Sequence, residues 1–167
     1  HGQWYVRMED LDPPRESADA ASSILRTLDT LGLHHDGSVL YQSQRHPAYE
    51  HALEQLAAKQ LTYACDCSRQ QLAGSGGRYP GTCSSRHLPA SNKTAIRCRV
   101  PDSTLCFEDS LQGRCCQNLA ELTGDFIIKR KLGLYAYQLA VVIDDAWQQI
   151  THVVRGIDLL DSTPRQL

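Results

Sequence analysis

Three cysteines and a tyrosine crowd into one short stretch of this chain, and no other feature constrains its fold as strongly. Cys65 and Cys67 are one residue apart, and Tyr79 and Cys83 follow after a glycine-rich gap. Zinc prefers thiolate and imidazole ligands in a tetrahedron, and a local pair with a further ligand beyond a loop closes such a site. The three cysteines fit this pattern, and the glycine-rich residues 74–77 allow the turn that it needs.

The residues leave the fourth ligand open. By ligand preference, His87 is the natural choice, four residues after Cys83. Tyr79 is a rarer ligand, because its phenol must lose a proton whose usual pKa is about 10. The charge of a metal ion can supply the driving force for that loss. The alternative to a metal site is a set of three buried, inert thiols, since free cysteine is often buried.

The composition is that of a globular protein. The 167 residues suffice for one domain, or for one domain with a small insertion. Contents of 41% hydrophobic and 22% charged residues are ordinary, and no apolar run approaches the roughly 20 residues that span a bilayer. The net charge of −2 gives no general sign of nucleic-acid binding. Basic residues cluster locally at Arg97, Arg99 and 129–131. Solvated strand edges explain these clusters at least as well as nucleic-acid binding does.

The number and spacing of the cysteines bear on the cellular compartment. Seven is an odd number, and Cys115 and Cys116 are adjacent. Both facts argue against a complete disulfide framework and favour a reducing compartment, where thiols stay free or bind metal. We therefore expect a cytoplasmic protein. The sequence assigns no role beyond packing to Cys98, Cys106, Cys115 and Cys116.

Strand and helix patterns alternate in the first part of the chain. Period-two alternation predicts a strand over residues 3–10. Apolar residues at helical spacing predict a helix over residues 18–31, ended by Gly32, and a second helix over residues 47–59. A further strand is predicted over residues 94–100.

The second part of the chain continues this alternation. Residues 125–139 predict a strand, a turn and a returning strand, whereas residues 140–149 fit helix or strand. Residues 150–156 predict a short strand, and residues 161–167 open a helix. The alternation predicts a parallel sheet. Because the pattern is cut at both ends, we expect this chain to be the middle of a larger protein.

Six stretches of the sequence are specific enough to indicate a family. They are VRMEDLDPPRE, YQSQRH, CDCSR, GGRYPGTC, DFIIKRKLGLYAYQLAVVIDD and ITHVVRGIDLLDSTPRQ. Together they resemble the glutamyl-queuosine tRNA(Asp) synthetases, short relatives of the catalytic domain of glutamyl-tRNA synthetase. The resemblance covers essentially the whole chain. DLDPPRE and the compact cysteine–tyrosine segment favour this subfamily over the full synthetase, in which the corresponding regions differ.

The resemblance implies an α/β fold: an incomplete Rossmann-type catalytic domain of a class I aminoacyl-tRNA synthetase with a small zinc-binding insertion. It assigns residues 1–62 to the first part of the catalytic domain, residues 63–90 to the insertion, and residues 91–167 to the remainder with the glutamate pocket. The family activates glutamate with ATP and transfers the glutamyl group to the queuosine base at the wobble position of tRNA(Asp). We accordingly expect glutamate, ATP with Mg²⁺ and queuosine-bearing tRNA(Asp) as ligands, no membrane partner, and a monomer.

Three residues are expected to bind glutamate. Glu9 ends the first predicted strand, where ligands sit in open α/β sheets, and the family match assigns it to the α-ammonium group. Arg155 ends the last predicted strand and can bind a carboxylate through two parallel hydrogen bonds, and the match assigns it to the substrate carboxylate. Tyr137 matches a tyrosine that lines the pocket. Without the resemblance, the sequence also allows Glu9 to be a solvated carboxylate at a strand end. It likewise allows Arg155 to be a surface ion-pair partner and Tyr137 to be a core aromatic side chain.

The resemblance also implies the metal and its ligands. Cys65, Cys67, Tyr79 and Cys83 match a zinc site of the family, with the tyrosine as the fourth ligand. Four protein ligands leave no open position for water, so this zinc is expected to be structural.

No residue is expected to act as a general base, because adenylation needs positioning and charge stabilisation. Asp144 and Asp145 are expected to be structural, since consecutive side chains diverge. The family's HxGH-type and KMSKS-type ATP signatures are expected before His1 and after Leu167, so the chain alone is expected to be inactive. Two alternatives remain: a piece of an ordinary glutamyl-tRNA synthetase, and a non-catalytic, zinc-stabilised RNA-binding module.

Overall fold

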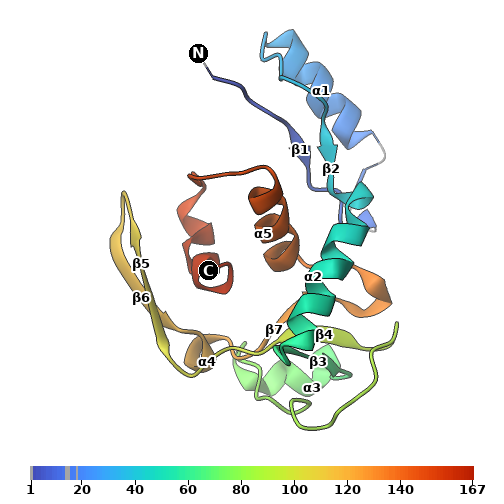
Figure 1. Ribbon diagram of the computed structural model, residues 1–167, viewed down its shortest axis with the longest axis vertical. Coiled ribbons are helices and arrows are strands. Elements are labelled where there is room, and N and C mark those ends of the chain that lie inside the picture. The colour runs from blue at the N-terminus through green and yellow to red at the C-terminus, as the bar shows by residue number, and fades with distance from the viewer. Residues whose placement is uncertain (1, 14–15, 18) are drawn as a thin grey trace. The chain divides into compact units, whose positions relative to one another are not determined.

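The computed structural model describes residues 2–13, 16–17 and 19–167. The chain divides into two compact units, residues 1–48 and residues 49–167, whose elements are labelled in Figure 1. Within the described ranges, none of the helices combines the length and the apolar character that a bilayer crossing requires.

The first unit contains a strand–helix–strand motif. β1 (Arg7–Met8) pairs in parallel with β2 (Leu40–Tyr41), and α1 (Ala20–Thr30) lies between them in the chain (Figure 1). Two hydrogen bonds extend the pairing toward the N-terminus. The Trp4 amide donates to the Asp36 carboxylate at 2.9 Å, and the Asp36 amide donates to the Trp4 carbonyl at 2.8 Å.

The strand and the helix predicted for the first unit are both found at the predicted positions. The strand predicted over residues 3–10 is present but short, because β2 offers only two residues opposite it. The helix predicted over residues 18–31 is confirmed as α1, although Ala18 itself lies outside the described residues. The helix ends where Gly32 adopts a φ of 73°, a backbone conformation that glycine tolerates best. None of the residues of α1 is buried.

The second long helix joins two parts of the core of the second unit. η2 (Gln42–Gln44) precedes α2 (His46–Ala58), which confirms the helix predicted over residues 47–59. Tyr49 and Asp144 are both fully buried. The Tyr49 hydroxyl donates a hydrogen bond of 2.6 Å to the Asp144 carboxylate, and this bond ties α2 to the helix that carries Asp144.

The central sheet of the second unit is antiparallel. Its strands are β3 (Thr62–Cys65), β4 (Ala95–Cys98) and β7 (Phe126–Lys129), in that order. β4 confirms the strand predicted over residues 94–100. The parallel sheet predicted from the alternation is wrong for this unit, because β4 pairs antiparallel with both of its neighbours. Parallel neighbours are usually joined by a crossover helix, whereas residues 66–94, between β3 and β4, contain only the short helices α3 (Arg69–Leu72) and η3 (Ala73–Ser75).

A β-hairpin in the second unit was not predicted from the sequence. β5 (Thr104–Asp109) pairs with β6 (Gly113–Asn118) over six residues, and a disulfide joins Cys106 to Cys116. For these two cysteines, the disulfide contradicts the expectation that the thiols of this chain stay free or bind metal. The other five cysteines of the chain are free thiols.

The segment after β7 differs from the predicted returning strand. η4 (Lys131–Gly133) follows β7, and a single bridge between Lys129 and Tyr135 is all that remains of the predicted return. α5 (Tyr137–Trp147) then begins, so most of residues 140–149, which fit helix or strand, are helical. The return goes no further than Ala136, whose amide donates to the Ile128 carbonyl of β7 at 2.9 Å, because α5 begins at the next residue.

The last part of the chain contains no strand within its described residues. The strand predicted over residues 150–156 is wrong, since Val153 and Val154 are 61% and 94% exposed and β-branched residues favour strands only when they pack against neighbours. η5 (Ile157–Arg165) is a 3-10 helix that begins before the helix predicted over residues 161–167. Three shorter elements complete the unit: α3 (Arg69–Leu72), η3 (Ala73–Ser75) and α4 (Leu119–Leu122).

Candidate functional site

The connection from β3 to β4 folds the cysteine segment into a compact loop. Cys65 is the last residue of β3, and Ser68, directly after Cys67, caps α3. The Ser68 hydroxyl accepts the Gln71 amide at 3.2 Å, and the Gln71 side chain accepts the Ser68 amide at 2.7 Å. This capping box fixes the start of the helix. Gly76, with a φ of 60°, ends η3 and lets the chain turn.

Four side-chain donor atoms meet at the end of β3. The Sγ atoms of Cys65, Cys67 and Cys83 lie within 4.8 Å of one another, and those of Cys67 and Cys83 are 3.5 Å apart. The Tyr79 hydroxyl oxygen lies 3.4 Å from the Cys65 sulfur and 3.9 Å from the Cys67 sulfur. Three of the four residues are buried, and Cys67 is half-buried. These are the four side chains that the family resemblance named.

Three of the six separations between the donor atoms fit a tetrahedral zinc ion. Zn–S distances of about 2.3 Å and a Zn–O distance of about 2.0 Å place tetrahedral donors about 3.8 Å (S to S) and about 3.5 Å (S to O) apart. The sulfur–sulfur distance of 3.5 Å and the sulfur–oxygen distances of 3.4 and 3.9 Å are close to these values. The Cys83 amide also donates to the Tyr79 hydroxyl oxygen at 2.9 Å, so this oxygen is already oriented as an acceptor.

His87 lies apart from these donors. Its side chain is exposed, and its backbone adopts a left-handed φ of 48°. In the part of the chain that the structure describes, one group of three or more His, Cys, Asp or Glu side chains is close enough to share a metal ion, and it consists of the three cysteines. The geometry therefore favours Tyr79 over His87 as the fourth donor.

The backbone of Tyr79 is held against the two residues that follow α4, Thr123 and Gly124. The Tyr79 amide donates to the Thr123 carbonyl at 2.8 Å. Gly124 follows with a φ of 62°, and a Cβ added there would lie 2.3 Å from the Tyr79 carbonyl oxygen. A residue far along the chain thus fixes the position of the tyrosine, and this position requires glycine.

Two arginines lie beside the sulfur cluster. Arg86 makes a bidentate ion pair with Asp66, at 2.7 and 3.1 Å, and one of its nitrogens lies 3.4 Å from the Cys83 sulfur. Arg97 is buried, and its guanidinium carbon lies 3.5 Å from the centre of the Tyr79 ring. Both cations are well placed to stabilise anionic donors.

The cluster shifts the pKa values of its own members in opposite directions. Burial by itself raises the pKa of the Cys65 thiol, yet hydrogen bonds with Tyr79 and Arg97 more than offset burial and lower this pKa to about 7. Burial and the neighbouring Cys83 and Cys65 thiols raise the pKa of Cys67 to about 11. Burial and hydrogen bonds with Cys65 and Cys83 also raise the pKa of Tyr79. A metal ion bound here must therefore displace protons.

Of the residues expected to bind glutamate, Glu9 lies in the first unit. It directly follows β1, as predicted, and its carboxylate lies 3.6 Å from the Arg7 guanidinium. Its side chain is 47% exposed, so it is accessible to a ligand. Its role in glutamate binding stays a prediction.

Arg155 and Tyr137 lie in the second unit. Arg155 was predicted to end a strand, and this prediction is wrong. The residue lies in the irregular segment before η5. Its guanidinium donates to the Gln166 side chain at 2.7 Å and to the Thr163 hydroxyl at 2.5 Å. Tyr137 is the first residue of α5, and its neighbour Gln138 accepts a hydrogen bond of 3.0 Å from Gln166. One polar network therefore links Arg155 to the residue beside Tyr137, and sequence reasoning did not find it.

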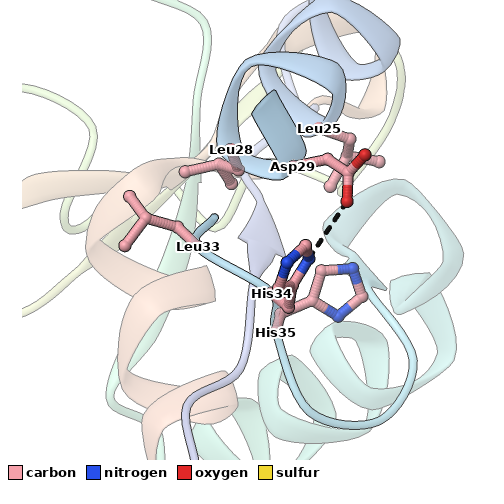
Figure 2. A pocket seen from close by; sticks show the side chains of 6 residues that line it. All are labelled: Leu25, Leu28, Asp29, Leu33, His34 and His35. Atoms are coloured by element: carbon pink, nitrogen blue, oxygen red, sulfur yellow. Dashed lines mark ion pairs between the residues drawn. The ribbon is translucent and has the colours of Figure 1, made fainter. Parts of the chain in front are cut away.

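A separate hollow lies on the first unit, between α1 and the loop that follows it (Figure 2). Figure 2 shows Leu28 and Leu33 on the left, Leu25 beside Asp29 at the upper right, and the rings of His34 and His35 below Asp29. The His34 Nδ1 atom lies 3.0 Å from an Asp29 oxygen, but both side chains are more than 70% exposed. None of the residues predicted to bind glutamate or metal lines this hollow. Its lining residues are Leu25, Leu28, Asp29, Leu33, His34 and His35.

Two solved structures share the fold of this chain. A glutamate tRNA ligase from Elizabethkingia meningosepticum CCUG26117, in complex with its amino acid, matches 99% of this chain and 39% of its own, with a TM-score of 0.83 and 22% identity. The glutamate-tRNA synthetase of Elizabethkingia anophelis matches equally well, over 40% of its length. This chain therefore shares its fold with these two glutamate tRNA ligases.

Sequence comparison identifies the family. The profile of the family "tRNA synthetases class I (E and Q), catalytic domain" matches residues 1–167, and the chain belongs to this family. The Glutamyl-Q tRNA(Asp) synthetase of Pseudomonas paraeruginosa (strain DSM 24068 / PA7) is 57% identical over 166 residues, 99% of this chain and 56% of that protein. The Pseudomonas putida (strain W619) protein of the same name is 54% identical over 167 residues.

These relatives confirm the family resemblance stated from the sequence. The relatives are named as synthetases, which are enzymes of the ligase class. The chain spans about half the length of the curated relatives that it matches. The activity, substrates and partners of the whole protein therefore belong to the proposal that follows.

Proposed function

We propose that the protein takes part in activating glutamate with ATP and transferring the glutamyl group to the queuosine base at the wobble position of tRNA(Asp). The observation that carries this proposal is the identity of 54–57% with proteins named Glutamyl-Q tRNA(Asp) synthetase, over 99–100% of the chain. The solved glutamate tRNA ligases are 22% identical over the same region. On this proposal the protein works where tRNA is found, in the cytoplasm, and acts as a monomer.

Charge complementarity supports the proposed glutamate site. Glutamate carries two carboxylates and one ammonium group, so its pocket needs at least one cation and one acceptor. The Arg155 guanidinium has five N–H donors, and its two hydrogen bonds to Gln166 and Thr163 leave others for a substrate carboxylate. We assign Tyr137 to the wall of the pocket and Glu9 to the substrate ammonium group.

No side chain needs to act as a nucleophile or a general base in this proposal. Attack of the glutamate carboxylate on the α-phosphate of ATP requires positioning of the two groups and stabilisation of the developing charge. ATP would enter with Mg²⁺, which binds phosphate oxygens. The residues of this chain contribute the amino-acid side of that arrangement.

The second part of the proposal is a structural zinc ion held by Cys65, Cys67, Tyr79 and Cys83. The fit of these donors to a tetrahedron supports it. Four protein donors leave no position for a water ligand, so the ion would supply stability and no Lewis-acid chemistry. It would fasten the loop that follows β3 to the end of that strand.

Transfer of labelled glutamate tests the proposed activity. The full-length protein is incubated with ATP, labelled glutamate and tRNA(Asp), prepared with and without queuosine. Labelling that requires both ATP and queuosine is the expected result. The likeness to glutamate tRNA ligases makes an ordinary glutamyl-tRNA synthetase the second candidate, and labelling of tRNA(Glu) would support it instead. No labelling of either tRNA by a protein that retains zinc would point to a non-catalytic RNA-binding module.

A further inference from the structure

Arg97 is a buried cation that forms no ion pair with any of the described residues. It lies on β4 with 6% of its surface exposed. One guanidinium nitrogen donates to the backbone carbonyl of Asp125 at 2.6 Å, and its Nε atom is buried without a hydrogen-bond partner. The nearby Asp125 carboxylate is engaged elsewhere, by the Tyr63 hydroxyl at 2.6 Å and the Val100 amide at 2.9 Å.

A buried charge of this kind requires a compensating charge. Transfer of a guanidinium from water into a protein interior is costly unless a group of opposite sign lies against it. One group against Arg97 is the Tyr79 ring, whose centre lies 3.5 Å from the guanidinium carbon. The other is Cys65, which lies diagonally across the β3–β4 pair on the same face as Arg97, because Tyr63 pairs with Arg97 and Cys65 with Ala95. As neutral groups, a phenol and a thiol compensate the cation only weakly. As metal ligands they are anions.

We propose that Arg97 is the counter-cation of the metal centre: it positions the Tyr79 phenolate and the Cys65 thiolate and balances their charge. This inference rests on the zinc site proposed above. Three thiolates and one phenolate carry four negative charges after their protons have passed to water, and zinc offsets two. Arg97 offsets a third from inside the protein. Arg86, whose side chain is 46% exposed, is shared between Cys83 and Asp66.

The shape of the guanidinium suits this role better than the shape of an ammonium group. A flat guanidinium stacks on an aromatic face while its edge donates hydrogen bonds, which a lysine cannot reproduce. Arg97 does both, because it covers the Tyr79 ring and donates to the Asp125 carbonyl. The same contact places its charge on the ring that would carry the negative charge of the phenolate.

Zinc affinity of the full-length protein, measured by competition with a chromogenic chelator, tests this role. Arg97→Gln keeps a donor for the Asp125 carbonyl and removes the charge, and it should lower the affinity about 10- to 100-fold, as loss of an outer-shell partner does. Arg97→Lys, which restores the charge, should recover part of the affinity. The matched control is Arg99→Gln, since Arg99 covers the Tyr63 ring at 4.6 Å and donates to the Ser84 carbonyl. It should bind zinc like the unaltered protein.

A double-mutant cycle with Tyr79→Phe separates charge balance from a general effect on folding. If Arg97 acts through the phenolate, its replacement should cost less affinity when residue 79 is phenylalanine. Equal costs in both backgrounds, or an unchanged affinity of Arg97→Gln, would overturn the inference while leaving the zinc site intact. If Arg97→Gln does not fold, the same cycle is run with Arg97→Met, which also removes the charge and keeps an unbranched apolar side chain. An unaltered protein that binds neither zinc nor cobalt would instead overturn the proposed zinc site and, with it, this role of Arg97.

Discussion

Gly124 lies directly against the backbone of Tyr79. A Cβ atom added to Gly124 would meet the Tyr79 carbonyl oxygen at 2.3 Å and the Tyr79 amide nitrogen at 3.3 Å. The contact joins the end of α4 to the cysteine loop, because the Tyr79 amide also donates to Thr123. The position of the proposed fourth zinc ligand thus depends on a residue 45 positions later in the chain.

Replacement of Gly124 should therefore disturb both stability and metal binding. Gly124→Ala adds a left-handed alanine, which costs about 1–2 kcal/mol, and a clash with backbone atoms that cannot move aside. We expect a total loss above about 3 kcal/mol in the free energy of unfolding, measured by urea denaturation, together with weaker zinc retention. Gly113→Ala is the matched control, since Gly113 has a φ of 76° and nothing within 4 Å of an added Cβ. Equal losses in the two variants would contradict the account.

The identity of the fourth metal ligand can be tested by paired substitutions. Tyr79→Phe removes only the hydroxyl oxygen that lies 3.4 Å from the Cys65 sulfur, and it should weaken zinc retention by more than about tenfold. His87→Ala should leave retention unchanged, because the exposed His87 ring lies outside the sulfur cluster. Chelator competition measures both. The opposite pair of results would move the fourth ligand to His87.

The buried bond between Tyr49 and Asp144 should contribute measurably to stability. Tyr49→Phe removes the 2.6 Å hydrogen bond and takes a donor away from a fully buried carboxylate. The expected loss is about 1.5–3 kcal/mol, typical of hydrogen bonds to charged groups. Tyr5→Phe serves as the control, since Tyr5 is 54% exposed and its hydroxyl bonds only to Gln3, and it should change stability by less than about 0.5 kcal/mol. Urea denaturation of both variants decides the matter.

A pH dependence follows from Glu50. The hydrogen bond from Lys129, at 2.6 Å, and that from the Tyr135 hydroxyl lower the pKa of Glu50 below its usual 4.5. A lowered pKa in the folded state means that the contribution to stability is complete above pH 4.5 and is lost as the pH falls through the folded-state pKa. Because the Glu50 side chain is 50% exposed, the contribution should stay below about 1 kcal/mol.

The test compares the unaltered protein with Glu50→Gln between neutral pH and pH 3. The difference in unfolding free energy should be constant near neutral pH and should shrink below pH 4.5. Glu54→Gln is the control, since its carboxylate is largely exposed and lies 4.0 Å from His51. A difference for Glu50→Gln that grows with acidification would contradict the assignment of the ion pair.

Local patterns in the sequence predicted the helices better than the strands. The apolar spacing that predicted residues 18–31 and 47–59 reappears in α1 and α2, because a helix satisfies its backbone within itself. A strand needs a partner, and the sequence does not say where that partner lies. Residues 150–156 show the consequence, since Val153 and Val154 have strand-forming side chains and no strand beside them.

The candidate site shows the same division between local and distant information. The spacing of Cys65, Cys67 and Cys83 predicted a cluster, and the structure brings their sulfurs together. Spacing alone could not decide between Tyr79 and His87, because the choice depends on how the loop turns and on the contact with Gly124. The alternation of Leu105 and Phe107 could have predicted β5. No local pattern joins Arg155 to Gln166.

The central claim is the transfer of glutamate to a modified base, and locating the label within the tRNA tests it most directly. Full-length protein, ATP and labelled glutamate are incubated with queuosine-bearing tRNA(Asp), and the tRNA is then digested to nucleosides and analysed by mass spectrometry. The account predicts a glutamyl group on the queuosine nucleoside and none on the 3′-terminal adenosine. A glutamyl group on the terminal adenosine, with none on queuosine, would contradict it and identify an ordinary glutamyl-tRNA synthetase.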